Sequence, residues 1–272
     1  MLVSVRHSTR YAFSRSASHG LQRLRLTPRS CGNQRVREWS VDLEGLTREV
    51  QYEDQHENIT MLVSVEAGAT AVAVTCAGLV ETTDNAGVHG RHTGPLPLWA
   101  YLGQTGLTQP GETMQALAQA VDHLVDRAPL PRLHELASRV REAVNYEVGR
   151  TEADTTAENA LRAGHGVCQD HAHIFIGIAR HLGIPARYVS GYLVLDGRVE
   201  QEAGHGWAEA HVEGLGWVGF DVSNGISPDP RYVRVASGRD YSDAAPVTGI
   251  SYGPGESALA VSLAVEQQPA AQ

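Results

Sequence analysis

Cysteine is scarce in this sequence, and its scarcity excludes two kinds of structure. Only Cys31, Cys76 and Cys168 occur among 272 residues, and they lie far apart. An odd, widely spaced set cannot form a disulfide framework, and the lack of a Cys-x-x-Cys pair argues against structural zinc. At least one thiol is therefore free.

Long apolar runs are also missing. No segment approaches the roughly 20 consecutive apolar residues needed to span a bilayer. The first residues, Met-Leu-Val-Ser-Val-Arg-His, lack the basic region, apolar stretch and cleavage site of a signal peptide. We therefore predict a cytoplasmic protein with no membrane partner.

Basic residues are not in excess in this sequence. The 22 Lys and Arg residues are outnumbered by 31 Asp and Glu residues, which gives a formal net charge of -9. This charge disfavours the phosphate-neutralising surface that nucleic-acid binding requires. With 42% hydrophobic and 19% charged residues, the composition is that of a folded, water-soluble protein with one large domain or two small ones.

Strand patterns dominate the first 90 residues. Short stretches rich in Val, Thr and Leu, several of them alternating, are separated by polar turns, which predicts an antiparallel β-sandwich-like domain. The clearest stretches begin at Leu21, Val36, Met61 and Ala71. Cys76 falls in the last of them and is interpreted as a small apolar strand residue. Residues 84–97 are rich in turn formers and are predicted to be a linker.

Helical patterns follow this linker. Apolar residues recur at three- and four-residue spacing over 112–126 and, after a break formed by two prolines, over 133–144. A third, short helix is predicted near residue 156. Thr155 and Glu158 fit a capping box there, with Thr155 as the N-cap and Glu158 reaching back to it.

A cysteine and two histidines lie together in Gly166-Val-Cys-Gln-Asp-His-Ala-His, just before an apolar helical pattern that ends at Gly183. If this helix begins near Val167, Cys168 stands in its first turn. Free backbone N–H groups and the helix dipole favour a thiolate there. Strand-like runs follow at 186–195, 207–212 and 217–221, so we expect the helix to pack on an antiparallel sheet.

Two later residues could complete a site for nucleophilic catalysis. A cysteine nucleophile needs a base, and a histidine base needs a third group that fixes its tautomer. His205 precedes one predicted strand and Asp221 closes the next, close enough for Asp221 to accept a hydrogen bond from His205. Spacing alone is weak evidence in a chain with 13 histidines.

Several motifs together resemble the bacterial transglutaminase-like cysteine peptidase superfamily. They are Gly166-Val-Cys-Gln-Asp-His-Ala-His, Gly183-Ile-Pro-Ala-Arg-Tyr-Val-Ser-Gly-Tyr, His205-Gly-Trp-Ala-Glu and Gly216-Trp-Val-Gly-Phe-Asp. In that family the order is Cys, His, Asp, so the resemblance implies that Cys168 is the nucleophile, His205 the base and Asp221 its orienting group. Leu24-Arg-Leu-Thr-Pro-Arg similarly resembles the β-sandwich region that precedes the catalytic core in bacterial members.

The predicted fold class is α+β. An antiparallel β-sandwich-like domain over residues 1–90 precedes a transglutaminase/papain-like catalytic domain over 91–272, which includes a C-terminal β extension. The resemblance places the catalytic cysteine at the N-terminus of a helix that packs on an antiparallel sheet.

Residues around the three candidates have predicted roles as well. The backbone N–H of Cys168 is a candidate oxyanion donor, and Gln169 could add a second. Asp170 suits N-terminal capping of the helix. Three bulky neighbours are expected to pack around the site or line it: His171, His173 and Trp207. His211, on the same strand face as Glu209, is interpreted as facing solvent.

A metal site is disfavoured. His165, Cys168, His171 and His173 offer soft and borderline ligands within nine residues. On a helix, however, His173 points away from His171, so one ion cannot easily collect all four. We predict no metal and no cofactor.

The function predicted from these features is hydrolysis of an amide or peptide bond through a thioester, with a peptide or amide as substrate. Two alternatives stay open: acyl transfer from protein glutamine to an amine, and a non-catalytic binding or scaffold protein that retains the fold. The last is supported by Gly206, because His-Ala-Trp is commoner in the family than His-Gly-Trp and a glycine could loosen the strand beside His205. The substrate and the oligomeric state also stay open.

Overall fold

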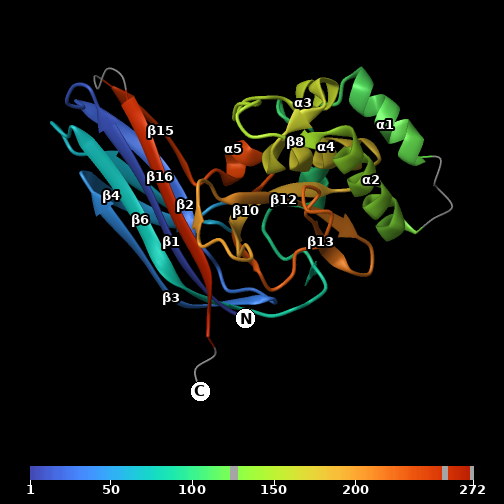
Figure 1. Cartoon of the computed structure of the whole chain (residues 1–272), viewed down its shortest axis with the longest axis horizontal. Coiled ribbons are helices and arrows are strands. Elements are labelled where there is room, and N and C mark those ends of the chain that lie inside the picture. Colours follow the sequence, from blue (N-terminus) through green and yellow to red (C-terminus); the bar gives the residue numbers. More distant parts are fainter. Residues whose placement is uncertain (123–127, 253–256, 270–272) are drawn as a thin grey trace.

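Strands and helices segregate along the chain in the computed structural model, which describes residues 1–122, 128–252 and 257–269 (Figure 1). Long strands alone occupy the chain up to Thr82, helices and a second antiparallel sheet follow, and the last two strands return to the first sheets. The predicted α+β class is confirmed.

The N-terminal strands form two antiparallel layers with an apolar core between them. Alternation buries apolar side chains on one face of a strand, as at Val72, Val74 and Cys76 on β6. Cys76 is fully buried, as predicted. The strands are β1 (Leu2–Phe13), β2 (His19–Thr27), β3 (Gln34–Glu44), β4 (Leu46–Glu53), β5 (Ile59–Val65) and β6 (Ala71–Thr82).

The C-terminal strands complete these two layers. β16 (Ser257–Gln268) pairs with β1 along its whole length, in a sheet of order β11-β16-β1-β6-β3, where β11 is Glu200–Gln201. β15 (Val247–Tyr252) pairs with β2 in a sheet of order β15-β2-β5-β4. The C-terminal β extension expected in the catalytic domain therefore lies within the sandwich. The domain boundary at residue 90 stays a prediction.

The predicted linker also contributes to a sheet. Within residues 84–97, β7 (Val88–Gly90) pairs with β13 (Gly216–Phe220), and a 3-10 helix, η1 (Leu98–Leu102), follows. A strand of three residues is too short to show an alternating pattern, which explains why the prediction missed it.

The second half of the molecule is built around one buried helix, α4 (Cys168–His181). It lies between α1 (Glu112–Asp122), α2 (Pro129–Ala143) and α3 (Ala157–Ala163) on one side and a sheet of order β14-β10-β12-β13-β7 on the other (Figure 1). The further strands are β10 (Ala186–Leu193), β12 (His205–Val212) and β14 (Tyr232–Gly238), with a short parallel pair β8 (Asn145–Tyr146) and β9 (His165–Gly166) and a short helix α5 (Tyr241–Ala244).

One helix prediction needs correction, and another extends beyond the described residues. The pattern over 112–126 is helical to Asp122, and residues 123–126 lie outside the described residues. The prolines expected to break the chain instead begin α2, because proline fits the first turn of a helix, where its missing N–H costs no hydrogen bond.

The predicted capping box at α3 is also wrong. The N-cap is Thr156, whose hydroxyl accepts a hydrogen bond from the backbone N–H of Asn159. Glu158 points to another helix, where its carboxylate accepts hydrogen bonds from the backbone N–H groups of Gly111, Thr113 and Met114. Glu158 therefore caps the start of α1.

Candidate active site

Cys168 is the first residue of α4, so the helix begins where the apolar pattern predicted. The Cys168 side chain is half-buried. Asp170 holds this end of the helix, because its Oδ2 accepts hydrogen bonds from the Val167 backbone N–H (2.8 Å) and the Thr151 hydroxyl (2.7 Å). A Cβ on Gly166 would lie 2.7 Å from the Asp170 side chain, so glycine is required before the cysteine. The predicted capping role of Asp170 agrees with this geometry.

His205 and Asp221 meet across neighbouring strands. His205 Nε2 lies 2.6 Å from Asp221 Oδ2, and Asp221 is 1% exposed. Burial alone would lower the pKa of His205, but the hydrogen bond to Asp221 and the adjacent Cys168 outweigh it and raise the pKa to about 10. The imidazole is thus held as a cation at neutral pH.

Two residues without a predicted role complete the surroundings of Asp221. The Tyr232 hydroxyl donates to Oδ2 (2.6 Å), and the Asn224 side-chain amide donates to the same oxygen (2.7 Å). Burial would raise the pKa of Asp221, but these bonds together with His205 lower it, so the carboxylate stays ionised.

A cleft of about 200 Å³ exposes Cys168 and His205 to solvent. Its walls come from both parts of the molecule. His7 on β1 and Arg25 on β2 line it from the sandwich, and Tyr188 on β10 lines it from the core. The space in front of the Cys168 thiol is therefore bounded by the N-terminal strands as well as by the core sheet.

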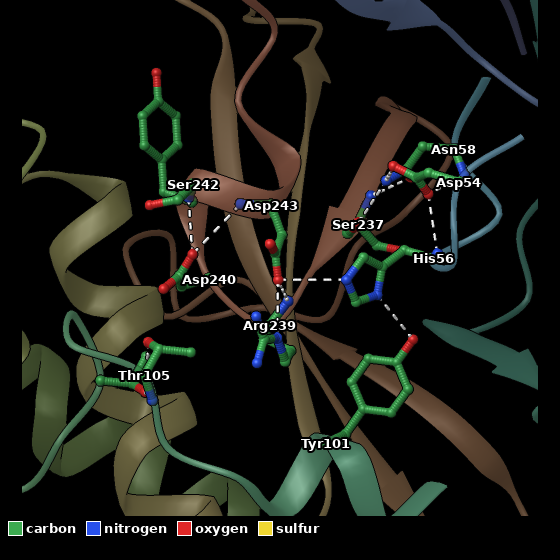
Figure 2. Close-up of polar contacts among 12 residues, drawn as sticks. Asp54, His56, Asn58, Tyr101, Thr105, Ser237, Arg239, Asp240, Ser242 and Asp243 are labelled. Carbon is green, nitrogen blue, oxygen red and sulfur yellow. Dashed lines mark hydrogen bonds and ion pairs between the residues drawn. The ribbon is translucent and has the colours of Figure 1, made fainter. Parts of the chain in front are cut away.

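The sandwich wall of the cleft is fastened to the core by a polar network (Figure 2). Asp54 accepts a hydrogen bond from Arg25 Nε (3.1 Å) and one from the Asn58 amide. Asn58 in turn exchanges two hydrogen bonds of 2.8 Å with the backbone of Ser237 on β14. Figure 2 also shows His56 between Asp243 and Tyr101, at 3.3 Å and 3.2 Å. Arg25 is thus held in place through β14.

Gly206 has a steric function in the structure. The Tyr188 hydroxyl would lie 2.0 Å from a Cβ built on Gly206, so no other residue fits without displacing that ring. This packing gives the glycine a steric reason, because Tyr188 occupies the position that a side chain would fill, and the loosening of the strand stays a prediction. Trp207 stacks on His205, with ring centroids 6.2 Å apart, and forms the expected hydrophobic wall.

His171 and His173, two of the histidines of α4, do not line the cleft. His171 Nε2 is 3.0 Å from the Val144 carbonyl oxygen, and His173 Nε2 accepts a hydrogen bond from the Tyr241 backbone N–H (3.0 Å). Both are buried and hold neighbouring segments against α4. Gln169 lines the cleft, and its side-chain amide donates to the Ala153 carbonyl (3.0 Å).

The structure does not bring together a metal-ligand set at this site. Among residues 1–122, 128–252 and 257–269, no group of three or more His, Cys, Asp or Glu side chains is placed to hold an ion. Over the same ranges, no helix has both the length and the apolarity to cross a membrane.

Comparison with known proteins agrees with this architecture. The family model described as the transglutaminase-like superfamily matches residues 115–222, and the bacterial transglutaminase-like N-terminal region matches residues 3–81. The first match contains Cys168, His205 and Asp221. The second covers the N-terminal sandwich strands.

Similar chains occur in mycobacteria. An uncharacterized protein of Mycobacterium leprae is 31% identical over 275 residues, covering 95% of this chain and 96% of its own. One of Mycobacterium tuberculosis is 30% identical over 292 residues, covering 97% and 92%. Among solved structures, a proposed cysteine protease from Cytophaga hutchinsonii has the same fold, with a TM-score of 0.73, 20% identity and coverage of 99% of this chain and 92% of that one.

Proposed function

The chain belongs to the transglutaminase-like superfamily, and on this premise we propose that it hydrolyses amide or peptide bonds with Cys168 as nucleophile. The observation that carries the proposal is the 2.6 Å contact between His205 and Asp221 beside a cleft that also contains Cys168. A buried, ionised carboxylate behind an imidazole is the arrangement that a cysteine nucleophile requires of its base.

Acylation follows from the orientation of the imidazole. Because His205 Nε2 is bonded to Asp221, Nδ1 is the nitrogen left for the thiol. The Cys168 thiolate attacks the carbonyl carbon of the substrate, and the negative charge moves to the carbonyl oxygen. Two donors are proposed for that oxygen. They are the backbone N–H of Cys168, which has no partner inside the helix, and Gln169. The C–N bond then breaks as His205 gives its proton to the departing amine.

Deacylation reverses these roles. His205, now neutral, takes a proton from a water molecule that attacks the thioester carbonyl. The C–S bond breaks, the carboxylic acid leaves, and the thiolate and the imidazolium are restored. Asp221 keeps its charge throughout and holds Nε2 of His205 protonated.

Hydrolysis is favoured over transfer to an amine by the exposure of the nucleophile. Cys168 is only half-buried, so water has access to a thioester at this position. Acyl transfer would need a site that excludes water and admits an amine. The description of the Cytophaga hutchinsonii protein as a proposed cysteine protease supports the same choice.

The direct test measures turnover of a panel of peptide amides by the native protein, Cys168→Ala and Cys31→Ser. Cys31 is an exposed thiol remote from His205, so Cys31→Ser is the matched control. We expect Cys31→Ser to retain turnover and Cys168→Ala to lose it at least about 1,000-fold. Full activity in Cys168→Ala would exclude the mechanism.

A labelled primary amine added to the same reactions separates the alternatives. Free acid as the main product supports hydrolysis, whereas an amine adduct as the main product identifies a transglutaminase. No turnover and no acyl-enzyme by mass spectrometry across the panel would favour a non-catalytic protein with this fold.

A further inference from the structure

A second cavity, of about 400 Å³, lies away from the cleft and shares no lining residue with it. The loop after β2, the segment around β7 and the outer face of the core sheet form its walls. Four arginines line it: Arg29, Arg91, Arg187 and Arg234. A cavity so rich in guanidinium groups is unexpected in a chain with a net charge of -9.

Two of these arginines are held in place by a buried carboxylate that the sequence analysis did not identify. Glu209 has no exposed surface, and it accepts hydrogen bonds from Arg187 Nε (2.5 Å) and Arg234 Nε (3.0 Å). Arg187 also lies over the Trp217 ring, 4.1 Å from its centroid. Both guanidinium groups are therefore oriented before any ligand arrives.

The terminal nitrogens of these guanidinium groups remain as donors. Arg187 makes a side-chain hydrogen bond with Tyr101, and within the described residues no carboxylate accepts a hydrogen bond from Nη1 or Nη2 of Arg187 or Arg234. His89 adds a buried Nε2 that makes no hydrogen bond and lies 3.3 Å from Glu209. An acceptor placed in the cavity could take hydrogen bonds from these guanidinium groups.

The charge around the cavity is unbalanced. Arg29 is neutralised by Glu53 and Glu57, at 3.3 Å and 3.4 Å. Arg91, Arg187 and Arg234 then face a single carboxylate, Glu209. The four arginines and the carboxylates of Glu53, Glu57 and Glu209 together leave one positive charge, which a bound anion would balance.

We propose that this cavity binds a phosphate anion, either free or as the phosphate group of a small molecule. The planar forks of Arg187 and Arg234 suit the oxygens of a phosphate, and exposed Arg91 at the rim adds a third charge. The site lies beside β10 and β14, which also contribute Tyr188 and Val235 to the cleft. The inference does not rest on the proposed hydrolysis.

The test titrates the whole protein with inorganic phosphate, glycerol phosphate, succinate and, at equal ionic strength, sodium chloride, by calorimetry. We expect saturable binding of a phosphate-bearing probe and none of chloride. Succinate should bind at least tenfold more weakly. Tighter binding of glycerol phosphate than of phosphate would identify a phosphate monoester as the ligand class, and the reverse would identify the free ion.

Arg91→Gln is the informative variant, because Arg91 is exposed and its loss leaves the Glu209 cluster intact. It should weaken phosphate binding at least fivefold, whereas Arg139→Gln, on the exposed side of α2, should not change it. Unchanged affinity in Arg91→Gln, or equal binding of chloride, would overturn the proposal.

Cysteine alkylation gives a second readout in the same samples. Cys31 lines the cavity and Cys168 lines the cleft. Saturating phosphate should slow the alkylation of Cys31 at least threefold and leave the rate at Cys168 unchanged. Equal protection of both thiols would contradict a separate site. The Cys168 rate reports on the proposed catalytic thiol independently, so failure of one proposal is distinguishable from failure of the other.

Discussion

The Asp221 carboxylate shows how a single residue sets the chemistry of the site. One of its oxygens accepts hydrogen bonds from His205, Tyr232 and Asn224, at 2.6, 2.6 and 2.7 Å. Each donor favours the ionised form, and together they overcome the cost of burying a charge. The charge that stabilises the His205 cation is therefore itself maintained by two neutral neighbours.

Removal of the Tyr232 hydroxyl should shift the pH dependence of the reaction. The pKa of Asp221 is lowered in the folded protein, so its carboxylate is ionised at neutral pH. The negative charge is lost as pH falls through that pKa. Tyr232→Phe deletes one stabilising donor and raises that pKa, so the acid limb of kcat/KM should move to higher pH. We expect kcat/KM at neutral pH to fall about tenfold.

A pH–rate profile of Tyr232→Phe checks this, with Tyr52→Phe as the control, because Tyr52 is exposed on β4. An acid limb in Tyr232→Phe that coincides with that of the native protein would show that the hydroxyl does not act on Asp221.

At the residue scale, local motifs named Cys168, His205 and Asp221 as candidates. The structure brings His205 and Asp221 within 2.6 Å of each other, and the catalytic roles stay a prediction. No sequence motif marks Tyr232 or Asn224. Their contacts with Asp221 depend on how the chain returns to that residue after β13. Glu209 lies on the strand face that was expected to meet solvent, and it is buried. The arginines that compensate its charge are 22 and 25 residues away, so no local pattern marks them.

At the scale of the elements, helix α1 depends on a residue of α3. Glu158 accepts three backbone N–H groups at the start of α1. Burial alone would raise the pKa of Glu158, but these hydrogen bonds lower it. The stability that Glu158 contributes to the fold is therefore present above the ordinary glutamate pKa and is lost as pH falls through the lowered pKa.

Glu158→Ala should lower the free energy of unfolding by about 1 to 2 kcal/mol at pH 7, in the range of a lost helix cap. Urea denaturation at pH 7 measures the effect. Glu152→Ala is the control, since Glu152 is exposed in the loop before α3. Equal stability of the two variants would mean that α1 does not need this cap.

Elements with a long, regular pattern were predictable, and those that depend on distant partners were not. The sandwich strands and α4 follow from alternation and from three- and four-residue spacing. The prediction missed β7 because three residues carry no periodic signal. It misassigned Glu158 because the capping-box pattern is local, whereas its true partners lie 44 to 47 residues earlier.

At the scale of the whole molecule, the two chain ends share one sheet. β16 covers β1 over twelve pairs, and Leu263 and Val265 pack with Val3 and Val5. The alternation of residues 259–265 is visible in the sequence, but nothing local names β1 as its partner. The N-terminal sandwich therefore requires the end of the chain.

A polypeptide of residues 1–90 should consequently fail to fold alone, because β1 and β2 would each present an unpaired edge. Fusion of residues 247–268, which contain β15 and β16, to it through a flexible linker should restore strand content and a cooperative thermal transition. Circular dichroism measures both. A cooperative transition in residues 1–90 alone would support an independent domain with that boundary.

Two buried histidines should make the molecule acid-labile. Burial lowers the pKa of His7 in the sandwich and of His173 in α4 to about 4. For such a group, stability is fully present above the ordinary histidine pKa of 6.5 and is lost as pH falls toward 4, because the unfolded chain binds the proton more readily. Unfolding in that window should take up as many as two protons.

Denaturation from pH 7 to pH 4 checks this, with His173→Gln against His181→Gln on the exposed end of the same helix. His173→Gln should flatten the pH dependence by about one proton, and His181→Gln should not change it. An unaltered slope in His173→Gln would show that His173 is charged in the folded protein.

The central claim is that Cys168 and His205 form a reactive ion pair. Its most direct test is the rate of Cys168 alkylation by iodoacetamide against pH, read by peptide mass spectrometry in the native protein and in His205→Ala, with Cys31 as the internal reference. We predict that Cys168 is alkylated much faster than Cys31 at neutral pH, and that His205→Ala removes this difference while the rate at Cys31 is unaffected. The same slow profile at Cys168 in both proteins would contradict the account.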